Sequence, residues 1–138
     1  MGKNANLNAY LENIEDIPFE WGVHDCFTFT NNAFRAMYGV GYADEWMGRY
    51  MSKDGTQPKT ANSLRREFKV SDIMQGLSSV MTKIEQPVFG SLVTTAKNQR
   101  WITGISLGIS IGSRAIFLST EGLIRLNIED VESAWTLC

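Results

Sequence analysis

Apolar side chains near the N-terminus recur at the spacing of an amphipathic helix. The residues that repeat are Leu7, Tyr10, Leu11 and Ile14. Pro18 should end this segment, because proline and the residue before it disfavour a continuing helix. The pattern therefore predicts a short helix that begins near the N-terminus and buries one side.

A second helix is predicted over residues 25–39. Asp25 is a residue type that caps helix N-termini, and Gly39 is the residue type that most often ends a helix. Between them the apolar residues again have helical spacing, so this helix should also bury one face. The stripe consists of the apolar residues Phe27, Phe34, Met37 and Tyr38 together with Thr30.

Residues 40–58 follow no clear period. They mix glycines with aromatic side chains, which predicts a loop with a short helix around residues 44–50. A loop of this length in a compact domain usually either binds a ligand or packs through its own side chains. Tyr42, Trp46 and Tyr50 are candidates for both roles, and the sequence leaves the two open.

Beyond the loop, the pattern changes from helix to strand. Residues 59–69 and 71–81 have helical spacing and predict two more helices. After Pro87 the chain is rich in β-branched and alternating apolar residues, which predicts four or five strands. The segments concerned are 88–95, 101–112, 114–119, 122–128 and 133–138. Glycines at every fourth position in 101–112 indicate two strands or one kinked strand.

This order of elements predicts an α+β fold. Helices come first and strands follow, so the N-terminal helices should pack on one face of a C-terminal antiparallel sheet. At 138 residues the chain is long enough to bury its own core, and its composition shows no linker and no repeat. We therefore expect a single domain over residues 1–138.

Charge and composition exclude several classes of function. The formal net charge of −2 argues against binding to a nucleic-acid backbone, which depends on clustered Lys and Arg. No apolar run is long enough to span a bilayer, and the N-terminus lacks the apolar core of a signal peptide, so we expect a protein made and kept in a cytoplasm. Two cysteines and one histidine fall short of a structural zinc site. We expect free thiols, no metal and no cofactor.

The candidate chemistry is concentrated at Cys26. A cysteine in the first turn of a helix is a setting for a reactive thiol, because the free N–H groups and the helix dipole stabilise the thiolate. A buried and inert cysteine is the alternative. Nucleophilic catalysis also needs a base, and the only histidine, His24, is a poor candidate because side chains two residues apart generally do not face each other. Asp25 between them is interpreted first as the helix cap.

The sequence around this cysteine resembles the first half of the NlpC-type cell-wall cysteine peptidases. Their Trp/Tyr-Gly turn leads into an Asp-Cys pair at the start of a helix that ends in glycine. A phage-encoded offshoot of that fold, of unassigned function, is more similar still. The matching positions are Trp21, Gly22, Asp25 and Cys26, then Gly48, Arg49 and Tyr50, and finally Ala134 and Trp135. The resemblance implies a papain-like NlpC-type core with the helix of Cys26 packed on the antiparallel sheet.

The resemblance does not extend to the catalytic base. The strand that begins Gly-Asp-Leu-Val in the peptidases corresponds to residues 90–93, where Ser91 replaces the aspartate. The next strand carries the histidine base in the peptidases. In one register Ile102 takes that position, and in a register four residues later Ser106 takes it. Neither residue is a base, and loss of one catalytic partner commonly costs several powers of ten in rate.

Three functions follow as hypotheses. The first is a structural component of a phage virion, in the tail or tail tip, that has lost peptidase activity. Its partners would be other phage structural proteins, joined as an oligomer and assembled in the host cytoplasm, with no nucleic acid and no membrane anchor. The second is an active cysteine hydrolase that cuts peptidoglycan peptide stems during entry, with Cys26 as nucleophile and His24, or a group from a partner chain, as base. The third is an effector that binds a host protein.

Overall fold

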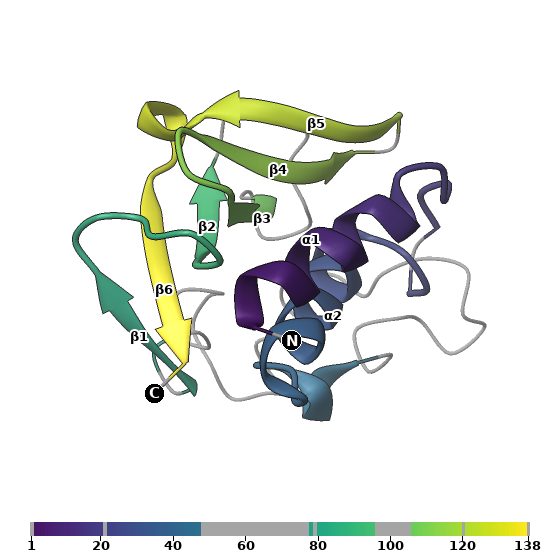
Figure 1. The fold of residues 1–138 in the computed structure, drawn as a ribbon, viewed down its shortest axis with the longest axis horizontal. Helices are drawn as coiled ribbons and strands as arrows, with labels where there is room; N and C mark the ends of the chain where they lie inside the picture. The colour runs from purple at the N-terminus through teal and green to yellow at the C-terminus, as the bar shows by residue number, and fades with distance from the viewer. Residues whose placement is uncertain are drawn as a thin grey trace, which may run out of the picture.

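The structure, a computed structural model, describes residues 2–20, 22–47, 78, 80–95, 106–119 and 121–137. Two α-helices precede the strands along the chain (Figure 1). The elements are α1 (Lys3–Ile14), α2 (Cys26–Tyr38), the 3₁₀ helix η1 (Asp44–Trp46), β1 (Met81–Ile84), β2 (Leu92–Thr95), β3 (Ser106–Ser110), β4 (Arg114–Ser119), β5 (Gly122–Asn127), the 3₁₀ helix η2 (Ile128–Asp130) and β6 (Ser133–Leu137).

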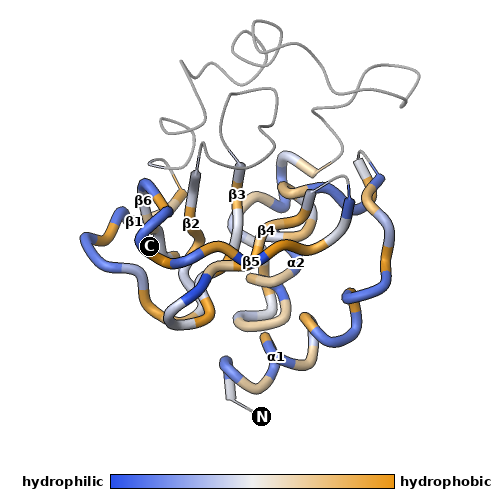
Figure 2. Tube along the Cα trace, turned by 90° about the horizontal axis from the view of Figure 1, so that it is seen from above, coloured by the Kyte–Doolittle hydropathy of each residue, from blue (hydrophilic) through white to orange (hydrophobic). Residues whose placement is uncertain are grey.

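Both predicted N-terminal helices are confirmed. In α1 the buried side chains are Leu7, Leu11 and Ile14, and hydrophilic and hydrophobic residues alternate along it in Figure 2. Helix α2 ends at Gly39, whose φ of 82° is in the left-handed region that glycine tolerates. The Gly39 N–H donates to the Arg35 carbonyl at 2.9 Å, so the helix ends as the sequence predicts.

Within the described residues, six strands form one antiparallel sheet in the order β1-β6-β2-β3-β4-β5. The last strand, β6, lies between β1 and β2, so the C-terminal end of the chain is inserted into the sheet. In Figure 1, β4 and β5 run steeply across the direction of β6 and β1, as in a strongly twisted sheet. The α+β class is therefore confirmed.

Each face of the sheet has its own apolar cluster. The larger cluster joins the helices to one face, and its members include Leu7, Phe27, Phe29, Phe34, Leu92, Leu107, Ile109, Ile116, Leu118 and Trp135. The smaller cluster lies on the opposite face and contains Val93, Ala115, Phe117 and Ala134. Alternation of side chains along β2, β4 and β6 produces this division, because successive residues of a strand point to opposite faces.

One prediction about the strands needs correction. The predicted helix over 71–81 is wrong at residue 81, because Met81 begins strand β1. Beyond Pro87 the described residues form five strands, which confirms the prediction of four or five, and β1 before Pro87 brings the sheet to six. The four residues of β1, Met81–Ile84, alternate little between apolar and polar side chains, so the sequence gives only a weak signal for a strand there. They form a strand because they pair with β6, from Met81 opposite Leu137 to Ile84 opposite Ala134.

Several predictions fall outside the described residues. These are the helix over 59–69, most of the helix over 71–81, the loop beyond residue 47, residues 101–105, Trp21 and Cys138. In the glycine-containing region, residues 106–110 form the single strand β3. Gly108 lies inside this strand, and Gly112, with φ of 108°, lies in the turn to β4.

Candidate functional site

A tight turn directly precedes α2. The backbones of Glu20 and His24 form an antiparallel bridge, with His24 N–H donating to the Glu20 carbonyl at 2.7 Å and Glu20 N–H donating to the His24 carbonyl at 2.9 Å. Gly22 has φ of 81°, and its N–H donates to Asp25 Oδ2 at 2.8 Å. The glycine thus supplies a backbone conformation that few other residues adopt.

Asp25 is the N-cap of α2, as the sequence predicts. Its Oδ1 accepts hydrogen bonds from the N–H groups of Phe27 at 3.0 Å and Thr28 at 2.8 Å. Thr28 Oγ1 accepts from the Asp25 N–H at 2.7 Å, which completes a capping box. Asp25 is fully buried, so its carboxylate is committed to the turn and the helix start.

Cys26 is the first residue of α2, with only 5% of its surface exposed. Burial, followed by the negative charge of Asp25, raises the pKa of the Cys26 thiol to about 12. Backbone hydrogen bonds from Leu107, Cys26 and Phe27 act in the opposite direction and are outweighed. At neutral pH the group is therefore a thiol and not a thiolate, despite its place at a helix N-terminus.

His24 is also buried, with 6% of its surface exposed, and its Nε2 has no hydrogen-bond partner among the residues that the structure describes. Burial lowers the pKa of His24, and the charge of Asp25 opposes this shift. The imidazole is neutral at pH 7 as a result. No hydrogen bond in the described structure links its Nε2 to the Cys26 thiol, so the two candidate residues do not form a dyad through that nitrogen.

The start of β3 lies against the thiol. Leu107 packs in the same apolar cluster as Cys26, and its backbone acts to lower the pKa of the thiol, whereas the side chain of the neighbouring Ser106 points to the opposite face of the sheet. Ser106 is 2% exposed. A serine hydroxyl is too weak a base at neutral pH to deprotonate a thiol, so this position supplies no general base. Ile102 lies outside the described residues.

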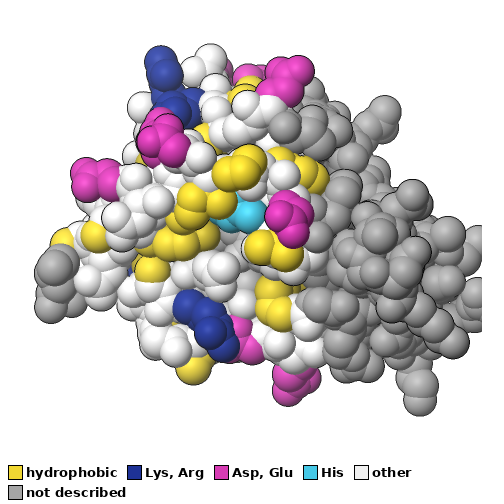
Figure 3. All heavy atoms as spheres, turned by 90° about the vertical axis from the view of Figure 1, so that its right-hand side faces the viewer, with side chains coloured by type: hydrophobic (Ala, Val, Ile, Leu, Met, Phe, Trp, Pro, Cys, Tyr) yellow, Lys and Arg dark blue, Asp and Glu magenta, His cyan; other side chains and the backbone are white. Residues whose placement is uncertain are grey.

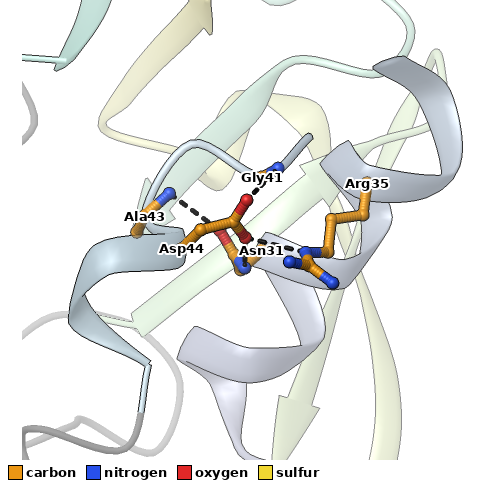
Figure 4. Close-up of polar contacts among 5 residues, drawn as sticks. All are labelled: Asn31, Arg35, Gly41, Ala43 and Asp44. Atoms are coloured by element: carbon orange, nitrogen blue, oxygen red, sulfur yellow. Dashed lines mark hydrogen bonds and ion pairs between the residues drawn. The ribbon is translucent and has the colours of Figure 1, made fainter. Parts of the chain in front are cut away.

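The first part of the predicted loop is fixed by polar contacts, which Figure 4 shows. Asp44 Oδ1 accepts from Asn31 Nδ2 and from Arg35 Nε, each at 2.8 Å, and Oδ2 accepts from the Gly41 N–H at 3.0 Å. Asn31 Oδ1 accepts from the Ala43 N–H at 2.7 Å. The Arg35 hydrogen bond is the first cause that lowers the pKa of Asp44 to about 2.

These contacts give the aromatic residues of the loop a packing role. Tyr42 is 5% exposed and its hydroxyl hydrogen-bonds with Thr30 Oγ1 at 2.8 Å, while Trp46 packs against the main apolar cluster. Of the two alternatives for the loop, packing is confirmed for Tyr42. The sequence shows no sign of the contacts among Asn31, Arg35 and Asp44, because they join residues 9 and 13 positions apart on two elements.

Other kinds of site find no support in the described ranges. Among residues 2–20, 22–47, 78, 80–95, 106–119 and 121–137, no group of three His, Cys, Asp or Glu side chains could hold a metal ion. In the same ranges no helix is both long and apolar enough to cross a membrane. The described chain is thus an α+β domain whose distinctive chemical group is a buried thiol at the start of α2.

Comparison with known proteins assigns the chain to a family. It belongs to the family described as a domain of unknown function, DUF6950, which matches residues 2–137. No curated protein and no solved structure matches the chain. Because the family description names no activity, the function has to be inferred from the residues themselves.

Proposed function

We propose that this protein is a structural component of a phage virion, in the tail or tail tip, with a papain-like NlpC-type fold and no peptidase activity. The observation that carries the loss of activity is the burial of Cys26, which is 5% exposed and lies beside the buried Asp25, so that the pKa of the thiol is raised to about 12. A cysteine nucleophile must be a thiolate when it attacks.

The arrangement around Cys26 supports kinship with the NlpC-type fold. A cysteine begins a helix, that helix packs on an antiparallel sheet, and the thiol meets the backbone of β3. Leu107 packs in the same apolar cluster as Cys26, so alternation along β3 turns the buried Ser106 to the opposite face of the sheet. Ser106 therefore offers the thiol no base, which agrees with a fold that is retained without peptidase activity.

The virion assignment rests on the order of motifs shared with phage proteins. Of these, Gly22, Asp25 and Cys26 build the turn and cap described above, and Ala134 and Trp135 are buried in β6. These five described residues have structural roles, which suits a protein that acts through surfaces. Its neighbours would be other phage structural proteins, joined as an oligomer during assembly in the host cytoplasm.

Alkylation of Cys26 tests the loss of activity. In a Cys138→Ser background, we expect iodoacetamide at pH 7 to modify folded Cys26 at least about a thousandfold more slowly than the urea-unfolded chain, since a pKa near 12 leaves little thiolate and burial restricts access. Peptide mass spectrometry locates the adduct, and Cys26→Ala provides the blank. Alkylation of the folded chain as fast as that of the unfolded chain would contradict the proposal.

Quantitative mass spectrometry of purified virions tests the assignment to the particle. We expect this protein in a fixed ratio to the other tail proteins, unchanged by further gradient purification. A protein present in infected cells and lost from purified particles would instead support a role as an effector. This result is independent of the alkylation rate, so the two parts of the proposal can fail separately.

A peptidoglycan hydrolase is the second candidate, favoured by one observation. Backbone groups of Leu107, Cys26 and Phe27 act to lower the pKa of the thiol against the effect of burial. Such an environment would stabilise a thiolate if a partner opened the site to water. Release of peptide fragments from purified cell walls by the wild-type protein, and not by Cys26→Ala, would support this candidate over the first.

A further inference from the structure

The segment from the end of α1 to the start of α2 is strongly acidic. Residues 12–24 contain four acidic side chains and no Lys or Arg. Glu15 lies 3.7 Å from Arg125. Glu12, Asp16 and Glu20 are exposed and form no ion pair with any residue that the structure describes. The negative charges of Glu12, Asp16 and Glu20 are therefore not neutralised by an ion pair within the described fold.

The same segment exposes apolar side chains. Val23 is 63% exposed and Ile17 is 44% exposed, which makes them two of the most exposed large hydrophobic residues described. Figure 3 views this side of the molecule and shows the histidine side chain between hydrophobic side chains, with acidic side chains around them. An apolar centre within a charged rim is the usual composition of a protein-binding surface.

The histidine lies at the centre of this surface. His24 is the only histidine of the chain, 94% of its surface is buried, and its Nε2 has no hydrogen-bond partner in the described structure. The small exposed part of the imidazole lies between hydrophobic side chains, so a molecule that covers them also covers the ring, while the buried Nε2 stays out of its reach.

We propose that this surface binds a partner protein that presents an apolar side chain flanked by Lys or Arg. The surface consists of Glu12, Asp16, Ile17, Glu20, Val23 and His24, and we name it the His24 face. The apolar side chain of the partner covers Val23 and Ile17, and its cationic groups meet the three unpaired carboxylates.

Charge complementarity selects this partner over others. Like charges placed against each other are costly, so acidic proteins and nucleic acid are disfavoured, whereas a basic partner is steered to the face and held in register. Arg35 already pairs with Asp44 of the same chain, and Arg125 with Glu15, so neither arginine pairs with the three carboxylates of the face. This inference does not depend on the virion assignment.

The single histidine makes the binding test direct. Its imidazole resonances in a nitrogen-15 NMR spectrum report on the His24 face without overlap from other histidines. As probes we would use short synthetic peptides with a central Leu or Tyr flanked by Lys and Arg, together with matched peptides in which Glu replaces every cationic residue. We expect the cationic peptides to shift the His24 signals, and we expect this binding to weaken as salt is added.

Two variants with the same change in charge give the control. The triple variant Glu12→Gln, Asp16→Asn, Glu20→Gln should weaken peptide binding by at least about tenfold. The matched variant Glu85→Gln, Glu129→Gln, Glu132→Gln changes three exposed acids after β1 and in and after η2, and its affinity should stay at the wild-type value. Val23→Ser should reduce binding in the wild-type charge background. Thermal unfolding verifies that each variant is folded.

Three results would overturn the inference. The first is that cationic peptides leave the His24 signals unmoved, and the second is that both triple variants bind them equally well. The third is that the protein self-associates in sedimentation experiments and that Val23→Ser restores the monomer. That last outcome would assign the face to a second copy of this chain.

Discussion

Burial, more than the helix dipole, sets the protonation of the two candidate residues. Cys26 stands at a helix N-terminus, which favours a thiolate, yet desolvation raises its pKa to about 12. The same effect lowers the pKa of His24, because burial disfavours the charged form of any group. Both side chains are thus neutral at pH 7, and this differs from the ion pair that activates many cysteine nucleophiles.

The lowered pKa of His24 predicts acid sensitivity. Above the ordinary pKa of about 6.5, His24 is neutral in both the folded and the unfolded chain. As the pH falls below that value the unfolded chain gains the proton first, so the free energy of unfolding should decrease by up to about 1.4 kcal/mol per pH unit. The loss levels off once the pH has passed the lower pKa of the folded state.

Urea unfolding between pH 7 and pH 5 measures this effect. The variant His24→Gln has no titrating group at the position, so its stability should vary less over the same range. An identical pH dependence of the wild type and the variant would show that His24 is not the group responsible.

At the scale of single elements, the start of α2 depends on one carboxylate. Asp25 accepts hydrogen bonds from Gly22, Phe27 and Thr28 while it is fully buried. Asp25→Ala leaves these N–H groups without an acceptor, and we expect it to destabilise the protein by about 1–3 kcal/mol in urea unfolding. Asp25→Asn keeps one acceptor oxygen at similar volume and should lose clearly less. Equal losses in the two variants would indicate that the charge, and not the cap, is what matters.

Attachment of η1 to α2 depends on Asp44. The variant Asp44→Ala removes the partner of the Asn31 amide, which is buried, so we expect a loss of about 1–3 kcal/mol in the free energy of unfolding. Arg35→Met should raise the pKa of Asp44 towards its ordinary value, but the pair is exposed and screened by solvent, so this variant should lose clearly less stability than Asp44→Ala. A larger loss for Arg35→Met than for Asp44→Ala would contradict this assignment.

The pKa of Asp44 gives this attachment a defined pH range. Because the folded pKa is lowered from 3.8 to about 2, the carboxylate contributes stability above the ordinary pKa, and the contribution is lost as the pH falls towards 2. The difference in unfolding free energy between the wild type and Asp44→Ala should therefore shrink as the pH falls from about 4 towards 2. A difference in unfolding free energy between the two proteins that is the same at pH 7 and pH 2.5 would contradict it.

At the scale of the whole molecule, the sheet carries apolar side chains on both faces. Gly108 allows this on β3, because Phe117 of the neighbouring strand lies over it. A Cβ atom at Gly108 would stand 2.5 Å from the Ile116 carbonyl oxygen and 2.6 Å from the Phe117 ring. These distances leave no room for a methyl group.

The variant Gly108→Ala should therefore be less stable by about 1–3 kcal/mol. Gly2→Ala is the control, since nothing lies within 4 Å of the added atom; Gly2 is the N-cap of α1, so this variant should lose only the preference of that position for glycine over alanine. Thermal unfolding of the two variants against the wild type measures the difference. A Gly108→Ala variant as stable as Gly2→Ala would mean that the strands shift apart without cost.

The sequence by itself determined the elements whose signals are local. The stripe of Leu7, Leu11 and Ile14 predicted α1, and the cap residues Asp25 and Gly39 predicted both ends of α2. The β-branched segments predicted β4 and most of β2, β5 and β6. Spacing and capping act over a few residues, so one sequence is enough to show them. The same holds for the choice of Cys26 and His24 as candidates, which depended on residue type and position.

Features that depend on contacts between residues far apart in the sequence were decided only by the tertiary structure. Strand β1 exists because Met81–Ile84 pairs with β6 at the other end of the strand-forming region, and no short window contains that information. Contact between Cys26 and Leu107 likewise depends on how α2 packs on β3. The sequence left open whether the thiol is reactive or inert, because a helix N-terminus favours a reactive thiolate while cysteine is also a residue type that is often buried and inert. Burial decided between them, and the extent of burial is a property of the packed molecule alone.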